Sequence, residues 1–128
     1  MTSTWVAVRS AGSVPAVSYS ITHIDDVPAE RGPHPAASTF DKRVSARLGL
    51  ANFGLYQLEL PPGATTEPHD HVQDEVEDAY AVIRGGGWVV VDGQEVPIGV
   101  GQFVGVTKES KRFIRAGQDG CVLIAVCA

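Results

Sequence analysis

The chain has 128 residues, of which 44% are hydrophobic and 20% charged, and its mean hydropathy is +0.03. These values indicate one ordinary soluble domain with a sizeable core and exclude a multidomain machine. With a net charge of −5, the chain lacks the positively charged surface through which proteins bind nucleic acids and anionic membranes. We therefore expect neither a nucleic acid nor a membrane among the partners.

The apolar runs and the first residues predict a cytoplasmic protein. The longest apolar run, Cys121–Ala128, has eight residues, whereas a membrane span needs about 20. The first four residues, Met1–Thr4, lack the basic and apolar regions of a secretory signal. Cys121 and Cys127 would lie on one strand about 20 Å apart, which excludes a disulfide between them.

The first 50 residues are predicted to form an N-terminal arm. Trp5–Val8 and Val17–Thr22 are candidate strands, since Val17–Thr22 alternates apolar and polar residues. Pro28–Pro35 contains three prolines and one glycine and is predicted to be a loop. Asp41–Leu50 is a candidate for a short helical turn.

Residues 51–128 are predicted to form an antiparallel β-sandwich or barrel. The chain contains 14 glycines and eight prolines, and many of them separate short apolar runs. Asp92-Gly93 is the strongest hairpin signal. Short strands at such spacing are typical of all-β folds. The expected strands are Phe53–Leu60, Asp78–Arg84, Trp88–Val91, Gln94–Ile98, Gln102–Val106, Lys111–Ala116 and Cys121–Val126, with Gly85–Gly87 and Gly117–Gly120 as corners.

His69-Asp70-His71 is the triplet most informative about chemistry. In an extended segment, residues two apart point to the same face, so both imidazoles could converge on one metal or ligand. Acidic residues follow closely, and Asp78 could add a carboxylate oxygen to the two imidazoles. Such a set can hold Fe(II) or similar ions with open positions. An exposed or hydrogen-bonded histidine pair is the simpler alternative.

The order of these motifs resembles the cupin family over roughly residues 53–126. Pro61-Pro62-Gly63 precedes the histidine pair, and Asp78 lies seven positions before Gly85, as in the first cupin motif. Gly101-Gln102-Phe103-Val104 resembles the glycine turn before the second motif. The resemblance implies a small single-domain protein with an antiparallel cupin-like β-barrel of the jelly-roll type (a double-stranded β-helix). It also implies that the motif histidines face inward.

Two departures from the family pattern concern the metal site. Spacing from Gly85 selects Asp78 as the acid, whereas spacing from His71 selects Glu75, and Glu77 is a third option. The second motif normally supplies a third histidine, but Thr107–Phe113 contains none. Lys111 is the first candidate for that place and Arg112 the next.

A cation at the third ligand position disfavours a metal ion. Arginine stays protonated and repels a divalent ion, and lysine ligates only after losing a proton. The candidate cofactor is therefore a weakly bound divalent ion (Fe, Mn, Ni or Zn) or none. The inward cation could instead pair with Asp78 or Glu77, or bind a carboxylate or phosphate on a ligand.

Three functions remain open at this point. The first is a barrel that binds a small molecule in its interior with weak or no metal dependence. The second is a metal-dependent enzyme, a dioxygenase or isomerase, that uses His69, His71 and an acid. The third is a structural or partner-binding barrel. The strand-like arm segments further predict a homodimer. The candidate ligand-binding residues are Tyr80, Val82, Lys111 and Arg112.

Overall fold

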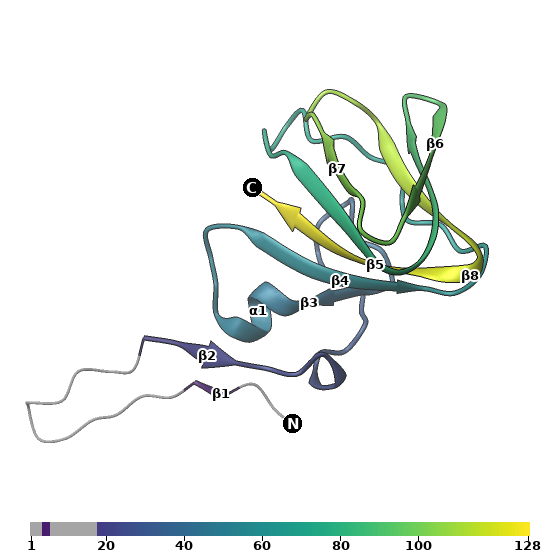
Figure 1. The fold of residues 1–128 in the computed structure, drawn as a ribbon. Helices are drawn as coiled ribbons and strands as arrows, with labels where there is room; N and C mark the ends of the chain where they lie inside the picture. Colours follow the sequence, from purple (N-terminus) through teal and green to yellow (C-terminus); the bar gives the residue numbers. More distant parts are fainter. Residues whose placement is uncertain (1–3, 6–17) are drawn as a thin grey trace, which may run out of the picture.

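The computed structural model describes residues 4–5 and 18–128 and is mostly β (Figure 1). The predicted all-β, antiparallel fold is confirmed. The main sheet has the strand order β3-β4-β8-β5-β6, and β7 also pairs with β5. Its strands are β3 (Asp41–Arg43), β4 (Gly54–Leu60), β5 (Asp78–Val91), β6 (Gln94–Gly99), β7 (Phe103–Val106) and β8 (Arg112–Cys127).

The first part of the chain contains little regular structure. Strands β1 (Thr4–Trp5) and β2 (Ser20–Ile21) pair with each other, and a 3-10 turn, η1 (Ile24–Asp26), follows. Residues 6–8 and 17 of the two predicted strands lie outside the described residues. The predicted loop Pro28–Pro35 is irregular except for a bridge at Ala29.

Of the helical turn predicted for Asp41–Leu50, Val44–Leu48 is helical. Helix α1 (Val44–Leu48) ends at Gly49, whose φ of 72° suits a glycine, while the three residues before the helix form β3. Because β3 pairs with β4, this part of the first 50 residues belongs to the main sheet. The division into an arm and a barrel at residue 50 stays a prediction.

Strands β5 and β8 are much longer than predicted. Each of these two strands joins two of the predicted ones. The β5–β8 ladder continues through both glycine-rich stretches, with register shifts at residues 82–87. These stretches bend the strands without ending them. At Gly85, a Cβ would collide with the carbonyl oxygen of Gly120, so only glycine allows this approach.

The other predicted strands agree with β4, β6 and β7 within one residue at each end. The predicted hairpin joins β5 to β6, and both of its turn residues have positive φ, 48° at Asp92 and 83° at Gly93. This is the conformation required by a turn whose twist matches that of the strands.

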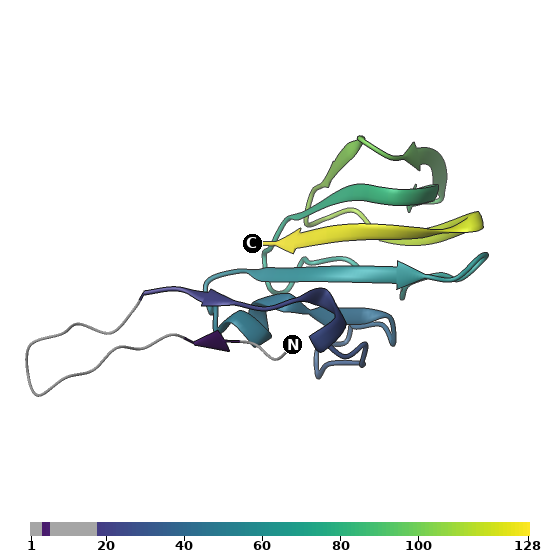
Figure 2. The same ribbon diagram turned by 60° about the horizontal axis from the view of Figure 1, so that its bottom comes forward.

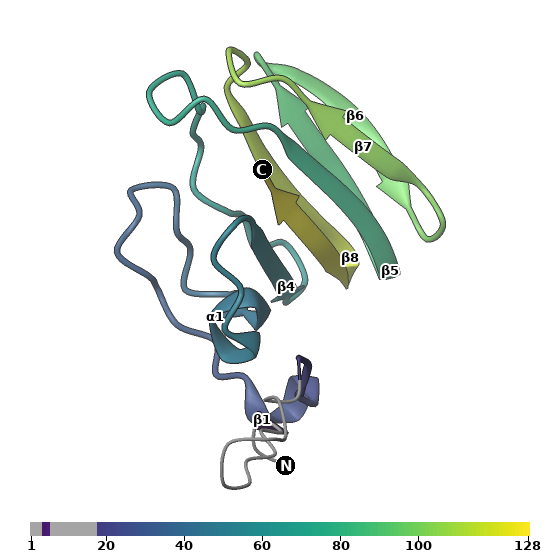
Figure 3. The same ribbon diagram turned by 90° about the vertical axis from the view of Figure 1, so that its left-hand side faces the viewer.

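The core lies between the two layers formed by the bent strands. Figures 2 and 3 show β1, β2 and α1 on the β4 side of the sheet, away from β6 and β7. In the part of the chain that is described, no helix is long and apolar enough to cross a membrane. The main core side chains are Leu58, Leu60, Val82, Val89, Ile98, Ile114 and Leu123.

Candidate functional site

A cavity of about 560 Å³ lies on the inner face of the sheet. Its floor includes one cross-strand row, in which Arg43, Tyr56, Ala125 and Tyr80 are direct neighbours on β3, β4, β8 and β5. Directly opposed residues of antiparallel strands project to the same face, so the row follows from the register. The small Ala125 in its middle leaves room above the sheet. This volume is typical of small-molecule sites.

The two motif histidines come from an extended segment beside β8. The backbone of His69 exchanges two hydrogen bonds with Arg112, of 3.0 and 2.8 Å. The His71 N–H donates to the carbonyl of Lys108 at 2.9 Å. This pairing places His69 directly across from Arg112 and directs both imidazoles toward Asp78 on β5.

Asp78 is the centre of a buried polar cluster. Its Oδ2 atom lies 2.9 Å from Nη1 of Arg112 and 3.1 Å from Nε2 of His71. Tyr80 donates its hydroxyl to the same oxygen at 2.9 Å, and Nε2 of His69 is 3.6 Å away. Arg112 is fully buried (0% exposed), and it also donates through Nη2 to the carbonyl of Thr107. A buried carboxylate and a buried guanidinium thus neutralise each other.

The protonation states in this cluster follow from burial and hydrogen bonding. Burial opposes ionisation of Asp78, but hydrogen bonds from His69 and other neighbours outweigh it and hold its pKa well below the usual range. Burial and the Asp78 charge raise the pKa of Tyr80, so its hydroxyl stays a donor. Burial alone would lower the pKa of His69, but hydrogen bonds to Asp78 and to the Glu67 carbonyl outweigh this effect, so the pKa is raised overall. The cluster therefore holds an ionised Asp78 among donors.

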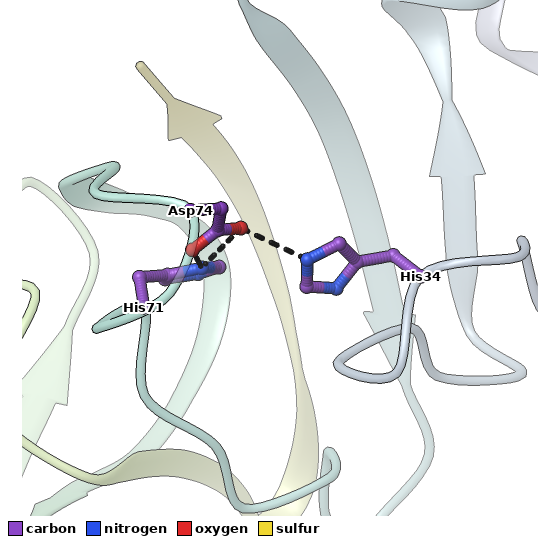
Figure 4. A group of neighbouring side chains, drawn as sticks. All are labelled: His34, His71 and Asp74. Carbon is purple, nitrogen blue, oxygen red and sulfur yellow. Dashed lines mark hydrogen bonds and ion pairs between the residues drawn. The ribbon is translucent and has the colours of Figure 1, made fainter.

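A hydrogen-bond chain extends from His71 of this cluster through Asp74 to the exposed His34 (Figure 4). Asp74 lies between two imidazoles, 3.0 Å from Nδ1 of His71 and 2.9 Å from Nε2 of His34. Because Nδ1 of His34 accepts the N–H of Ala36 at 3.0 Å, its Nε2 carries the proton and donates to Asp74. This group is satisfied as a hydrogen-bond chain, without a metal ion.

The structure distinguishes among the three acidic candidates. Of these, only Asp78 joins His69 and His71 in a group whose donor atoms lie within 4.8 Å of one another. Glu75 is exposed and pairs with Lys108 at 3.3 Å. Glu77 is also exposed, and its backbone pairs with Ala128.

Arg112, and not Lys111, takes the position predicted for a cation. Along β8, Arg112, Ile114 and Ala116 are buried, and this alternation leaves Lys111 exposed and outside the cavity. The prediction from the sequence placed Lys111 first and was wrong by one residue. Because neighbouring residues of a strand point to opposite faces, this error moves the side chain to the other face of the sheet. Tyr80 lines the cavity, whereas Val82 and Arg112 are buried and do not line it.

The donor set does not fit a tightly bound divalent ion. Two imidazoles and a carboxylate would suit one, but a metal about 2.0–2.2 Å from the Asp78 oxygen would lie close to a guanidinium. That guanidinium is 2.9 Å from the same oxygen and cannot give up its charge. The positive charge of Arg112 thus lies close to any ion bound by the Asp78 oxygen and opposes its binding.

Three residues that sequence reasoning missed also line the cavity: Arg43, Tyr56 and Cys127. The alternation of β4 places Tyr56 on the same face as Leu58, so its position could have been read from the sequence. Nothing in the sequence indicates that Arg43 reaches the cavity. Cys121 and Cys127 are free thiols, and burial together with Asp78 raises the pKa of Cys127 to about 12.

These features define a small jelly-roll protein with an interior cavity and a polar cluster at one end. No protein-family model and no curated protein sequence matches the chain. Solved structures do match it. The polyketide cyclase RemF from Streptomyces resistomycificus is 24% identical, over 84% of this chain and 77% of that one, with a TM-score of 0.68.

Two further matches carry the cupin description. A cupin protein from Bacteroides fragilis is 21% identical, over 77% of this chain and 81% of that one, with a TM-score of 0.63. A sugar phosphate isomerase of the cupin superfamily from Silicibacter pomeroyi is 22% identical, over 69% of this chain and 57% of that one, with a TM-score of 0.62. The predicted likeness to small cupin proteins is confirmed, and the chain has the cupin fold.

The titrating residues predict that stability has a plateau in mildly acidic solution. The pKa of Asp78 is lower than in the unfolded chain, so its contribution is lost as the pH falls below about 4. The pKa of His69 is higher than in the unfolded chain, so its contribution is lost as the pH rises above about 6.5.

Urea unfolding at several pH values from about 3 to 8 measures both limbs. Asp78→Asn should flatten the acidic limb, and His69→Gln should flatten the alkaline limb. Persistence of the alkaline limb in His69→Gln would assign it to another group.

Proposed function

We propose that this protein binds a small molecule in the cavity of its cupin barrel, with weak or no dependence on a metal ion. The observation that carries this proposal is the ion pair between Arg112 and Asp78 at 2.9 Å, behind a cavity of about 560 Å³. The cavity supplies space for a ligand. The guanidinium of Arg112 balances the charge of Asp78, a role that a metal ion can fill in related folds.

A metal-dependent enzyme, dioxygenase or isomerase, is less well supported. His69, His71 and Asp78 have the right atoms within 4.8 Å of one another, but the guanidinium of Arg112 repels the ion that this chemistry needs. A purely structural barrel leaves the cavity and its polar residues without a role. The isomerase and cyclase named among the neighbours show that such folds can serve enzymes, and the fold alone does not choose between these functions.

The proposal is tested by titration with the neutral fluorescent probe N-phenyl-1-naphthylamine. We expect saturable binding of one probe per chain, because the cavity volume is within the usual range for small ligands. Chelation with EDTA should change the dissociation constant by less than about twofold. A loss of binding on chelation would favour the metal-dependent enzyme, and no binding at all would favour the structural barrel.

Two alanines on the same sheet provide matched variants. Ala125→Phe fills the centre of the cavity floor and should abolish binding, whereas Ala79→Phe adds the same side chain on the outer face. Equal effects of both variants would show that the probe binds elsewhere.

The homodimer remains part of the proposal. Strand β2 pairs with the short β1, and Tyr19 before it and Ile21 within it are 51% and 62% exposed. These side chains offer apolar surface to a second copy. Light scattering should give twice the mass of one chain, and a monomeric mass would refute the dimer. The cytoplasmic location likewise stays a prediction.

A further inference from the structure

Arg43 is the positive charge of the cavity that lacks an ion-pair partner among the described residues, and it interacts with the Tyr56 hydroxyl. It lies at the β3 end of the floor row, and among the described residues that line the cavity it is the only arginine or lysine. Within the described part of the chain, no carboxylate forms an ion pair with its guanidinium, whereas Arg31, Arg112 and Arg115 each have one. Arg47 and Arg84 also lack an ion pair in that part of the chain, but neither lines the cavity. A half-buried guanidinium without a counter-ion is costly unless a ligand supplies one.

The neighbours of Arg43 in the cavity lining are the Tyr56 hydroxyl and the Asp41 carboxylate. Burial raises the pKa of Tyr56, and the adjacent Arg43 only partly opposes this, so the hydroxyl keeps its proton. The nearby carboxylate of Asp41 is already satisfied, because it accepts the O–H of Ser38 at 2.7 Å and the N–H of Ser38 at 3.1 Å. This end of the cavity therefore offers hydrogen-bond donors and a positive charge.

The side chain of Arg43 borders the loop that contains Gly32. It packs against Gly32, where an added Cβ would lie 3.4 Å from its Cδ atom. The loop that contains Gly32 is fixed by contacts nearby, including the bond from Nη1 of Arg31 to the carbonyl of Ala37 at 2.9 Å.

We infer that the ligand is an organic anion whose charged oxygen group binds Arg43, assisted by the Tyr56 hydroxyl, and whose uncharged body extends over Ala125. This inference rests on the proposed function and adds the class of ligand to it. Arginine binds carboxylate and similar oxygen groups through two parallel hydrogen bonds.

The register separates the anion from the acidic end of the cavity. Arg43 and Tyr80 lie on strands three spacings apart, or about 14 Å. Asp78 lies at the Tyr80 end, and its charge is balanced there by Arg112. An anionic group at Arg43 is thus well away from Asp78. The nearer carboxylate is that of Asp41, which also lines the cavity and accepts both hydrogen bonds from Ser38.

Two probes that differ by one sulfonate test the inference. 8-Anilinonaphthalene-1-sulfonate is anionic, and N-phenyl-1-naphthylamine has the same ring system without the charge. Arg43→Gln should weaken binding of the sulfonate about tenfold or more and change binding of the neutral probe less than about twofold. Arg43→Lys should recover part of the lost affinity. Arg84→Gln removes the same charge from an exposed position outside the cavity and should change neither titration.

The possible outcomes separate this inference from the proposed function. An unchanged affinity for the sulfonate in Arg43→Gln, or an equal loss for both probes, overturns the inference and leaves the proposed function standing. No binding of either probe to the native protein overturns the proposed function. If Arg43→Gln does not fold, the salt dependence of the native protein decides. Added salt should weaken binding of the sulfonate probe and leave binding of the neutral probe unchanged. Equal responses of the two probes overturn the inference.

Discussion

Replacement of Arg112 by methionine is expected to lower the free energy of unfolding by about 3–5 kcal/mol. Arg112 is 0% exposed and forms an ion pair with Asp78, which is itself 6% exposed. The substitution leaves a buried carboxylate without its counter-ion, and this costs more than the hydrogen bond alone. Urea unfolding followed by circular dichroism measures the loss.

The double variant Arg112→Met/Asp78→Leu removes both charges and serves as the comparison. It should be more stable than Arg112→Met, because no isolated charge remains in the interior. Arg84→Met, at an exposed position, should change stability by less than about 0.5 kcal/mol. Strictly additive effects of the Arg112 and Asp78 substitutions would contradict the buried ion pair.

Replacement of Arg112 by histidine is expected to create a metal site. The backbone of Arg112 pairs directly with that of His69, so a third imidazole at this position would start beside the other two donors. The change removes the repelling charge and adds a lone pair. We expect Zn²⁺ or Ni²⁺ to bind the variant at least about 100-fold more tightly than the native protein, a difference of about 2.7 kcal/mol.

Isothermal titration calorimetry of the native protein and of Arg112→His measures this difference. Arg112→His/His71→Ala lacks one imidazole and should lose the gain. Equal affinities of the native protein and Arg112→His would show that Arg112 does not exclude the ion.

Local sequence signals predicted much of the fold. The Asp92-Gly93 turn and the alternation of β4 and β6 are decided by neighbours in the chain, and their strands agree closely with prediction. The continuity of β5 and β8 was missed, because it depends on pairing between strands distant in sequence. A glycine run predicts a break, but the ladder partner decides whether it becomes a bend.

The sequence predicted the buried cluster only in part. The His69 and His71 spacing and the count back from Gly85 placed two imidazoles near Asp78, as the structure shows. The choice between Lys111 and Arg112 required the register of β8, which a local pattern does not fix. Arg43 could not be predicted, because it reaches the cavity through the pairing of β3 with β4.

Elemental analysis of the native protein, purified without chelator, tests the central claim most directly. The claim is that Arg112 replaces a metal ion as the charge partner of Asp78. We expect far less than one metal ion per chain, both in the native protein and in the His69→Ala/His71→Ala double variant. One ion per chain in the native protein that is lost in the double variant would contradict the claim.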